Sequence, residues 1–322
     1  MTELPAGGRL PPAALPAGSR DVLPVEAAEL RAIEAALRER FAAFGYREVM
    51  TPVLEYEDVV DRAQEGALRE AFRLFDETGR VLVLRPDLTI PVARLVATRM
   101  ADHPGPVRVS YVARAFRPPR PGRPRRSELR QAGVELVGAS GPGADAEAVA
   151  LLVDGLRAAG LADARVAVAD VSLTAAVLDG LDLAAPDRAA LGAALAARDF
   201  VQWRRRGRAV RGRGADPGLL EELPTLRGGR EALARVAEGA PAAAPACARL
   251  EAMLDLVGAH GAGDAVMVDL GIMRDWSYYS GVVMEAYAPG VGAPVAMGGR
   301  YDGLAARFGR ARPAVGFAIT LD

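Results

Sequence analysis

Arginine is concentrated in one stretch of this chain, between Tyr111 and Gly138, which reads YVARAFRPPRPGRPRRSELRQAGVELVG. Seven arginines fall between Arg114 and Arg130, and the short apolar run RQAGVELVG follows. A guanidinium group is a planar fork of donors that suits phosphate and carboxylate oxygens, so the stretch indicates a loop that binds anions. The chain contains no Lys and no Asn, and this bias in composition lowers the weight of any single arginine.

Two polar residues, Gln131 and Glu135, follow this loop on the expected return strand. They are four residues apart, so their side chains share one face of the strand. A buried pair of this kind is costly without a polar partner, and a ligand would provide one. The alternative is a strand face that water covers, and the sequence leaves both open.

Three further motifs contain groups that recognise ligands. In RPDLT (85–89), Asp87 either caps the following helix, which the local sequence favours, or binds a ligand ammonium with Thr89. In IMRDWSYYSG (272–281), adjacent tyrosines on a strand would point to opposite faces. In MGGRYDGL (297–304), the paired glycines allow a close backbone approach beside a ligand, and a plain glycine turn is the alternative.

The elements that position these motifs predict an α+β fold. Strand patterns occur before and after a block of helical character, which indicates one antiparallel core with an inserted helical subdomain. We expect a mobile segment at 1–18, the first part of the core at 19–172, the insertion at 173–258 and the second part of the core at 259–322. The basic run WRRRGRAVRGRG (203–214) suggests nucleic-acid binding when taken alone, but we expect an exposed loop of the insertion.

Composition excludes several classes of protein. A net charge of −1 argues against a general binder of nucleic acid or membranes, and 51% hydrophobic residues support a substantial core. The N-terminus lacks the pattern of a signal peptide, and no apolar window is long enough to span a membrane. With two histidines and one cysteine, Cys247, we expect no metal site and no cofactor. We expect Cys247 to be buried and the protein to be cytoplasmic.

The motifs, in this order, resemble the catalytic core of histidyl-tRNA synthetase, a class II aminoacyl-tRNA synthetase. LPAGSRDVLP resembles the opening of that family, TPVLE its motif 1, RPDLT a substrate segment, and AFRPPRPGRPRRSELRQAGVELVG its motif 2. IMRDWSYYSGVVME and MGGRYDGL resemble its two histidine signatures, and AVGFAITLD resembles the start of motif 3. The resemblance implies a class II synthetase-like antiparallel sheet flanked by helices.

Departures from the synthetase pattern are concentrated where ATP would bind. Phe116 and Arg117 of motif 2 are present, but Pro119 occupies the position of the glutamate that reads adenine. Ser127 and Leu129 replace a later arginine and an aromatic residue. The sequence ends at Asp322, so we expect neither the motif 3 arginine nor an anticodon-binding domain. This combination resembles the synthetase paralogues that serve as regulatory subunits of ATP phosphoribosyltransferase.

That resemblance implies a non-catalytic subunit. It would act with a short-form catalytic subunit in the first step of histidine biosynthesis, form a homodimer through the class II core, bind L-histidine as feedback effector and bind no tRNA. Carboxylates and Gln131 would bind the ammonium group of histidine. Arg117 or Arg274 would bind its carboxylate, and a tyrosine would contact its ring. Two alternatives remain: a synthetase fragment that activates histidine, and a scaffold without a ligand. The expected histidine-binding residues are Asp87, Thr89, Arg117, Gln131, Glu135, Arg274, Tyr278, Tyr279 and Tyr301.

Overall fold

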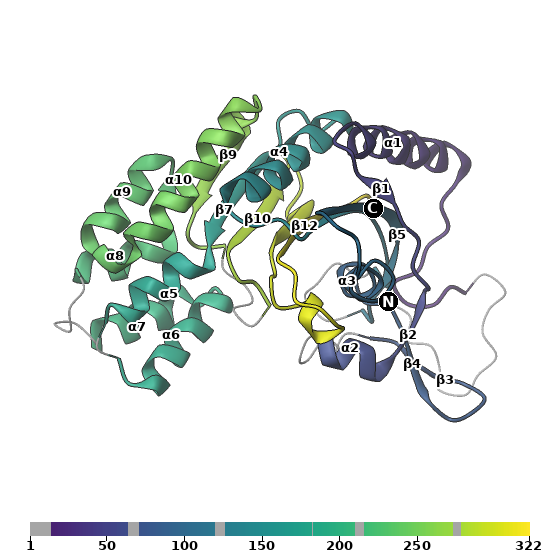
Figure 1. The fold of residues 1–322 in the computed structure, drawn as a ribbon, viewed down its shortest axis with the longest axis horizontal. Helices are drawn as coiled ribbons and strands as arrows, with labels where there is room; N and C mark the ends of the chain where they lie inside the picture. Colours follow the sequence, from purple (N-terminus) through teal and green to yellow (C-terminus); the bar gives the residue numbers. More distant parts are fainter. Residues whose placement is uncertain (1–13, 64–70, 120–125, 182, 210–215, 273–277) are drawn as a thin grey trace.

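The fold is built around one large sheet (Figure 1). The computed structural model describes residues 14–63, 71–119, 126–181, 183–209, 216–272 and 278–322. In these ranges the large sheet has the strand order β1-β5-β6-β12-β11-β10-β7-β9-β8, and a smaller sheet has the order β2-β4-β3. Neighbouring strands are antiparallel except for the pairs β1–β5 and β7–β9, which are parallel. The expected antiparallel α+β sheet is confirmed, with a parallel pair towards each end.

Strands of the large sheet come from both halves of the chain. They are β1 (Arg47–Glu48), β5 (Val107–Phe116), β6 (Glu128–Val137), β7 (Arg165–Asp170), β8 (Arg227–Gly228), β9 (Val266–Asp269), β10 (Val282–Tyr287), β11 (Ala296–Arg300) and β12 (Ala314–Thr320). The smaller sheet, here named the arm, contains β2 (Leu54–Tyr56), β3 (Arg73–Phe75) and β4 (Val81–Leu84). A hairpin joins β3 to β4, and its turn closes where Asp76 accepts hydrogen bonds from the backbone N–H groups of Thr78 and Arg80.

Helices cover both faces of the large sheet. Helices α1 (Pro24–Ala43) and α4 (Pro142–Ala158) pack on one face, and α3 (Thr89–Arg99) packs on the other. Helix α1 ends where Gly45 adopts a φ of 85°, a left-handed conformation that favours glycine. Helix α2 (Glu57–Ala63) lies beside the arm. None of the described helices combines the length and the apolar composition needed to cross a membrane.

A group of helices occupies the end of the molecule remote from the arm (Figure 1). These helices are α5 (Val171–Asp179), α6 (Ala185–Ala196), α7 (Phe200–Ala209), α8 (Pro217–Glu222), α9 (Arg230–Gly239) and α10 (Ala244–Ala259). They share the main hydrophobic cluster with the sheet and contribute the edge strand β8. The domain boundaries at 173 and 258 therefore stay a prediction. Cys247 on α10 is buried, as expected.

The basic run in this region does not begin as a loop. Residues 203–209 belong to helix α7, and the rest of the run, 210–214, lies outside the described residues. Trp203 is fully buried, and its indole N–H donates to the carbonyl oxygen of Leu220 at 2.6 Å. The prediction of a loop is therefore wrong for 203–209, because the buried indole anchors this helix to its neighbour α8, whereas the arginines of the helix are exposed as expected.

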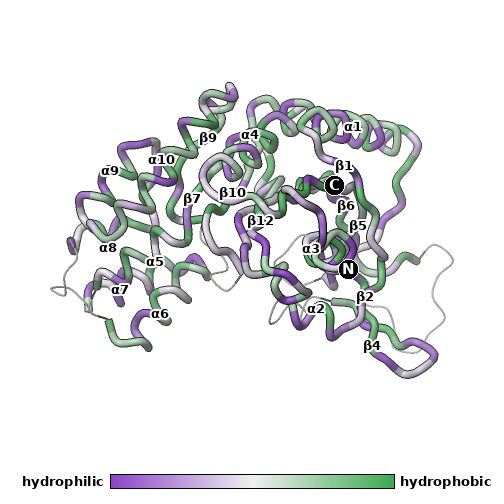
Figure 2. The backbone as a smooth tube through the Cα atoms, viewed as in Figure 1, coloured by the Kyte–Doolittle hydropathy of each residue, from purple (hydrophilic) through white to green (hydrophobic). Residues whose placement is uncertain are grey.

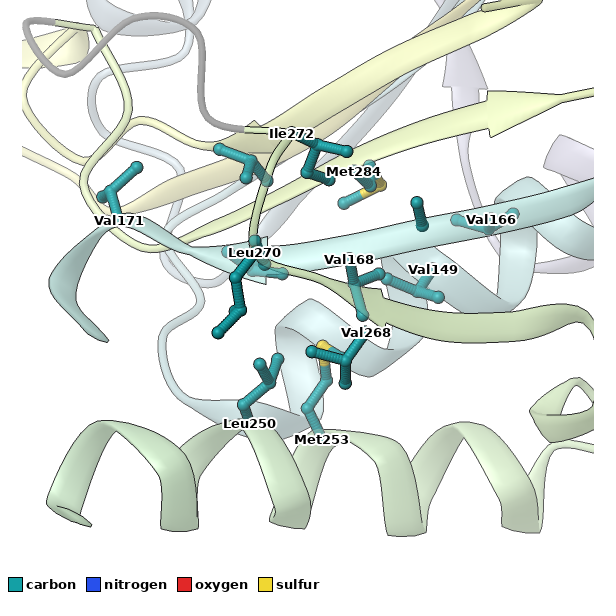
Figure 3. Packing of buried hydrophobic residues seen from close by; sticks show 14 of the residues in the cluster. Val149, Val166, Val168, Val171, Leu250, Met253, Val268, Leu270, Ile272 and Met284 are labelled. Carbon is teal, nitrogen blue, oxygen red and sulfur yellow. The ribbon is translucent and has the colours of Figure 1, made fainter. Parts of the chain in front are cut away.

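One face of the sheet is sealed by apolar packing. Figure 3 shows Val166, Val168, Val268 and Met284 among the clustered side chains, with Val149 of α4 and Leu250 and Met253 of α10 close by. Val168 pairs with Met284 on one side and with Val268 on the other, so alternate residues of three strands point to the same helices. The intervening residues therefore face the opposite side, where polar groups can gather.

Candidate functional site

The floor of the candidate site is the middle of β6, on the face turned away from α1 and α4. Gln131, Gly133 and Glu135 lie on this face because side chains alternate along a strand. Gln131 is 6% exposed and Glu135 is 1% exposed. The alternative of a strand face covered by water is therefore wrong.

Glycines on neighbouring strands make room for the polar groups. Tyr111 pairs with Gly133 across the β5–β6 ladder, and Gly316 of β12 pairs with Glu135. A Cβ atom on Gly133 would overlap the Tyr111 hydroxyl, and a Cβ atom on Gly316 would overlap the Glu135 carboxyl. Both glycines are thus required by close approach, and they let the two functional groups lie flat on the sheet.

Glu135 is the most deeply buried carboxyl of the site. The hydroxyl of Tyr301 donates to its Oε2, and the hydroxyl of Tyr111 lies 3.5 Å from its Oε1. Burial raises the pKa of Glu135 from 4.5 to about 8, although hydrogen bonds from Tyr301 and Thr89 oppose this shift. Glu135 is therefore mostly neutral at pH 7, and its carboxyl can donate as well as accept a hydrogen bond.

A second carboxyl, Asp87, lies at the N-terminus of α3. Its Oδ1 accepts the backbone N–H of Ile90 at 2.9 Å, so the predicted capping role is confirmed. Burial raises the pKa of Asp87, and the nearby positive charge of Arg117 opposes that effect. Arg117 is held in place because its Nε donates to the carbonyl oxygen of Pro86 at 2.7 Å. The negative charge of Asp87 adds to the effect of burial in raising the pKa of Glu135.

Tyrosines form one wall of the site. The rings of Tyr278 and Tyr301 are stacked with centroids 5.6 Å apart, and the ring of Tyr279 meets that of Tyr278 edge-on at 5.0 Å. Burial raises the pKa of Tyr278 and Tyr301 well above the usual value, so both hydroxyls remain protonated donors. Tyr278 and Tyr279 precede β10 rather than lying on a strand, so the expected strand alternation is wrong for this pair. Tyr279 packs partly against the main hydrophobic cluster.

The paired glycines Gly298 and Gly299 belong to strand β11, so the alternative of a plain glycine turn is wrong. A Cβ atom on Gly299 would meet the ring of Tyr279. The next residue, Arg300, points to the other face, where its Nε donates to Asp145 of α4 at 2.8 Å and its Nη1 donates to Asp302 at 2.9 Å. These contacts fix the end of β11, from which Tyr301 reaches Glu135.

The structure brings together most of the residues expected from sequence. Asp87, Thr89, Glu135, Tyr278 and Tyr301 form one cluster, and Arg117 lies at its Asp87 end. Gln131 lies on the same face, about 13 Å from Glu135 along the strand. Arg274 lies outside the described residues.

Sequence reasoning assigned Tyr111 only to the strand pattern and so missed its hydroxyl. The pairing of Tyr111 with Gly133 could have revealed the role of this hydroxyl. That pairing can be recognised only when the register of β5 and β6 is known. In the described part of the chain, no three His, Cys, Asp or Glu side chains are arranged to hold a metal ion.

Comparison with known proteins places this geometry in a family. The family model for histidyl-tRNA synthetase matches residues 18–322. The ATP phosphoribosyltransferase regulatory subunit of Moorella thermoacetica is 46% identical over 97% of this chain and 81% of that protein. The regulatory subunit of Rubrobacter xylanophilus is 42% identical over 95% of this chain and 74% of that protein. The chain belongs to the family of ATP phosphoribosyltransferase regulatory subunits.

A solved structure agrees with this family membership. The protein described as an ATP phosphoribosyltransferase regulatory subunit/histidyl-tRNA synthetase from Bacillus halodurans matches with a TM-score of 0.91 and 32% identity. The match covers 98% of this chain and 83% of that one. For a member of this regulatory-subunit family, the site offers two carboxyls, a guanidinium and a tyrosine wall, which together suit a small ligand with cationic, anionic and planar parts.

Proposed function

We propose that this chain is the regulatory subunit of ATP phosphoribosyltransferase. It assembles with a short-form catalytic subunit, is required for the first step of histidine biosynthesis and carries the site at which histidine inhibits that step. It contributes no reacting group of its own. The observation that carries this proposal is the tyrosine-bound Glu135 beside Asp87, in a chain whose motif 2 has Pro119 at the adenine-reading position.

The site fits free L-histidine, group by group. Glu135, which accepts a hydrogen bond from Tyr301 of the stacked pair, binds the imidazole, because a neutral carboxyl can donate to the unprotonated ring nitrogen. Asp87 with Thr89 takes the ammonium, and Arg117 takes the carboxylate. Each buried polar group then has a partner, whereas a group left without one costs roughly 1–3 kcal/mol.

Feedback requires that histidine bind one state of the enzyme complex more tightly than another. A coupling free energy of roughly 1–3 kcal/mol changes affinity about 5- to 150-fold. Because coupling is reciprocal, substrates of the catalytic subunit weaken histidine binding to the complex if histidine weakens theirs.

We also propose a homodimer, and its interface includes the arm. The register of β2, β4 and β3 places Leu54, Tyr56, Leu74, Leu82 and Leu84 on one face. Leu54, Tyr56 and Leu74 are each more than 40% exposed, and Figure 2 shows a hydrophobic stretch along β4. A contiguous apolar sheet face is typically covered by a partner, and a second copy supplies an apolar face of the same kind.

The decisive experiment mixes this chain with a short-form catalytic subunit and measures phosphoribosyl transfer with and without histidine. We expect activity only when both subunits are present, and inhibition by histidine. Glu135→Ala should abolish inhibition while leaving the activity of the complex intact. Histidine-dependent exchange of pyrophosphate into ATP by this chain alone would contradict the proposal and favour the synthetase. Inhibition that persists in Glu135→Ala would favour the scaffold without a ligand.

A further inference from the structure

A cavity of about 380 Å³ lies between the large sheet and the helices that follow α5. Its floor is Ala167 of β7 and Met267 of β9, and Phe200 and Ile272 form apolar walls. Arg198, Arg227, Asp269 and Tyr287 are the polar residues around it. Cavities of this size, with apolar walls and few polar groups, are typical of small-molecule sites between packed structural units.

Arg198 has a backbone conformation that marks it as unusual. Of the non-glycine residues that the structure describes, it alone has a positive φ, of 55°. It follows the C-cap of α6, Ala197, at a position where glycine is the common residue because a Cβ atom is strained there. The contacts of the Arg198 side chain offset the free-energy cost of this strained backbone conformation. Outliers of this kind concentrate at functional positions.

The side chain of Arg198 is built into the mouth of the cavity. Its Nη2 donates to Oε2 of Glu285 at 2.7 Å and lies 3.4 Å from the hydroxyl of Tyr287. Glu285 is 97% buried and also accepts a hydrogen bond from the hydroxyl of Tyr287. The buried carboxylate thus fixes both groups, and Arg198 has five N–H donors, more than these two contacts use.

A second guanidinium is oriented at the same cavity. Nε of Arg227 lies 2.8 Å from Oδ2 of Asp269, and Oδ1 of that carboxylate accepts the backbone N–H of Gly271 at 2.9 Å. The side chain of Arg227 is 58% exposed, so its outer edge is open to an incoming anion. Two anchored arginines beside an apolar floor therefore favour a ligand that joins an acidic group to a flat apolar body.

We propose that this cavity is a second ligand site, which takes a small organic anion with a planar apolar body. The anionic group binds between Arg198 and Arg227, and the planar body lies on Ala167 and Met267. The site is separate from the Glu135 cluster: both lie on the same face of the sheet, but β12, β11 and β10 lie between β6 and β7, a separation of about 19 Å. The proposal is independent of histidine binding.

Isothermal titration of the full chain with 1-naphthalenesulfonate tests this site, because the probe has both required features. We expect a Kd of about 0.1 mM, within the range for a ligand of this size. Arg198→Gly, which removes the guanidinium and suits the backbone, should weaken binding about tenfold. Ala167→Leu fills part of the cavity with a larger side chain and should weaken binding of the probe by a similar factor. This variant provides a second test if Arg198→Gly is poorly folded.

The controls separate this site from others. Arg208→Ala removes an exposed arginine that pairs with Glu221 on the same group of helices, and Glu135→Ala removes the histidine site; both should bind the probe unchanged. Naphthalenesulfonate binding that survives both Arg198→Gly and Ala167→Leu would overturn the proposal. Equal affinity for inorganic phosphate, or for uncharged 2-naphthol, would overturn the ligand class. Loss of probe binding in Leu54→Asp would place the probe on the arm and also overturn it.

Discussion

At the scale of single residues, the site depends on a carboxyl that is costly to bury. Glu135 has apolar and glycine neighbours on its strand and two tyrosine hydroxyls as partners, and its pKa is raised to about 8. Such a group adds little to the stability of the unliganded protein, because its charged form is disfavoured in the folded state. In the proposed function, this carboxyl recognises a polar ligand.

Tyr301→Phe tests the main contact of this carboxyl. The change removes the hydroxyl that donates to Glu135 and keeps the ring that stacks on Tyr278. We expect histidine to bind about 5- to 20-fold more weakly, which corresponds to roughly 1–2 kcal/mol for one hydrogen bond in a buried site. Titration calorimetry measures this. Tyr46→Phe is the matched control, since its hydroxyl donates to Glu147 instead, and an equal loss of affinity there would contradict the assignment.

Glu135→Gln tests the pKa through stability. The folded-state pKa of Glu135 lies above its usual value, so its favourable contribution is complete below pH 4.5 and is lost as the pH rises to about 8. The glutamine variant stays neutral throughout. Without ligand it should therefore unfold at a Tm at least about 2 °C above wild type at pH 8.5, with the difference shrinking towards pH 5. Thermal unfolding at several pH values measures this, with Glu128→Gln, half-exposed on the same strand, as control.

At the scale of elements, strand β11 links the site to helix α4. Tyr301 faces Glu135, while its neighbour Arg300 is buried on the other side and contacts Asp145 in the first turn of α4. The Oδ1 atom of Asp302 joins this network by accepting the backbone N–H of Ala314 at 3.0 Å. The position of Tyr301 is therefore set by the residues on both sides of it.

Arg300→Ala should break this link. It leaves the largely buried Asp145 without its cation, and loss of one partner of a buried ion pair costs roughly 3–5 kcal/mol. We expect a clear drop in the denaturation midpoint together with weaker histidine binding, because the end of β11 is released. Arg157→Ala, which breaks an exposed pair with Asp264, should cost less than about 1 kcal/mol. Similar losses for both variants would argue against a structural role for Arg300.

At the scale of the whole molecule, the arm leaves its apolar face uncovered. Glu55 and Val83 are buried, whereas the alternate residues are exposed on β2 and partly exposed on β4. Exposing the apolar side chains of this face to water costs free energy. Association with a partner removes that cost by burying them.

Leu54→Asp with Leu74→Asp should convert a dimer to a monomer. Two carboxylates on this face oppose association, and the residues make few contacts within the chain because each is more than 40% exposed. Light scattering after gel filtration measures the mass. Val201→Asp changes an even more exposed apolar residue on α7, away from the arm, and should leave the dimer intact. A double variant that remains dimeric would place the interface elsewhere.

Sequence alone determined much of the local arrangement around the candidate site. Spacing identified Gln131 and Glu135 as one face, RPDLT as a capping segment with Asp87, and the strands and helices around them. These predictions succeeded because they depend on local periodicity and on short-range hydrogen bonds, which neighbouring residues specify.

Only the tertiary structure decided whether those residues contact each other and which protonation state they adopt. The role of Tyr111 depends on its pairing with Gly133, and the raised pKa of Glu135 depends on burial by strands that are distant in sequence. The tyrosine pair before β10, the helix that contains Trp203 and the cavity at Arg198 could not be found from spacing, because each depends on how remote segments pack. Local sequence specifies the groups, and long-range packing sets their neighbours, their burial and therefore their chemistry.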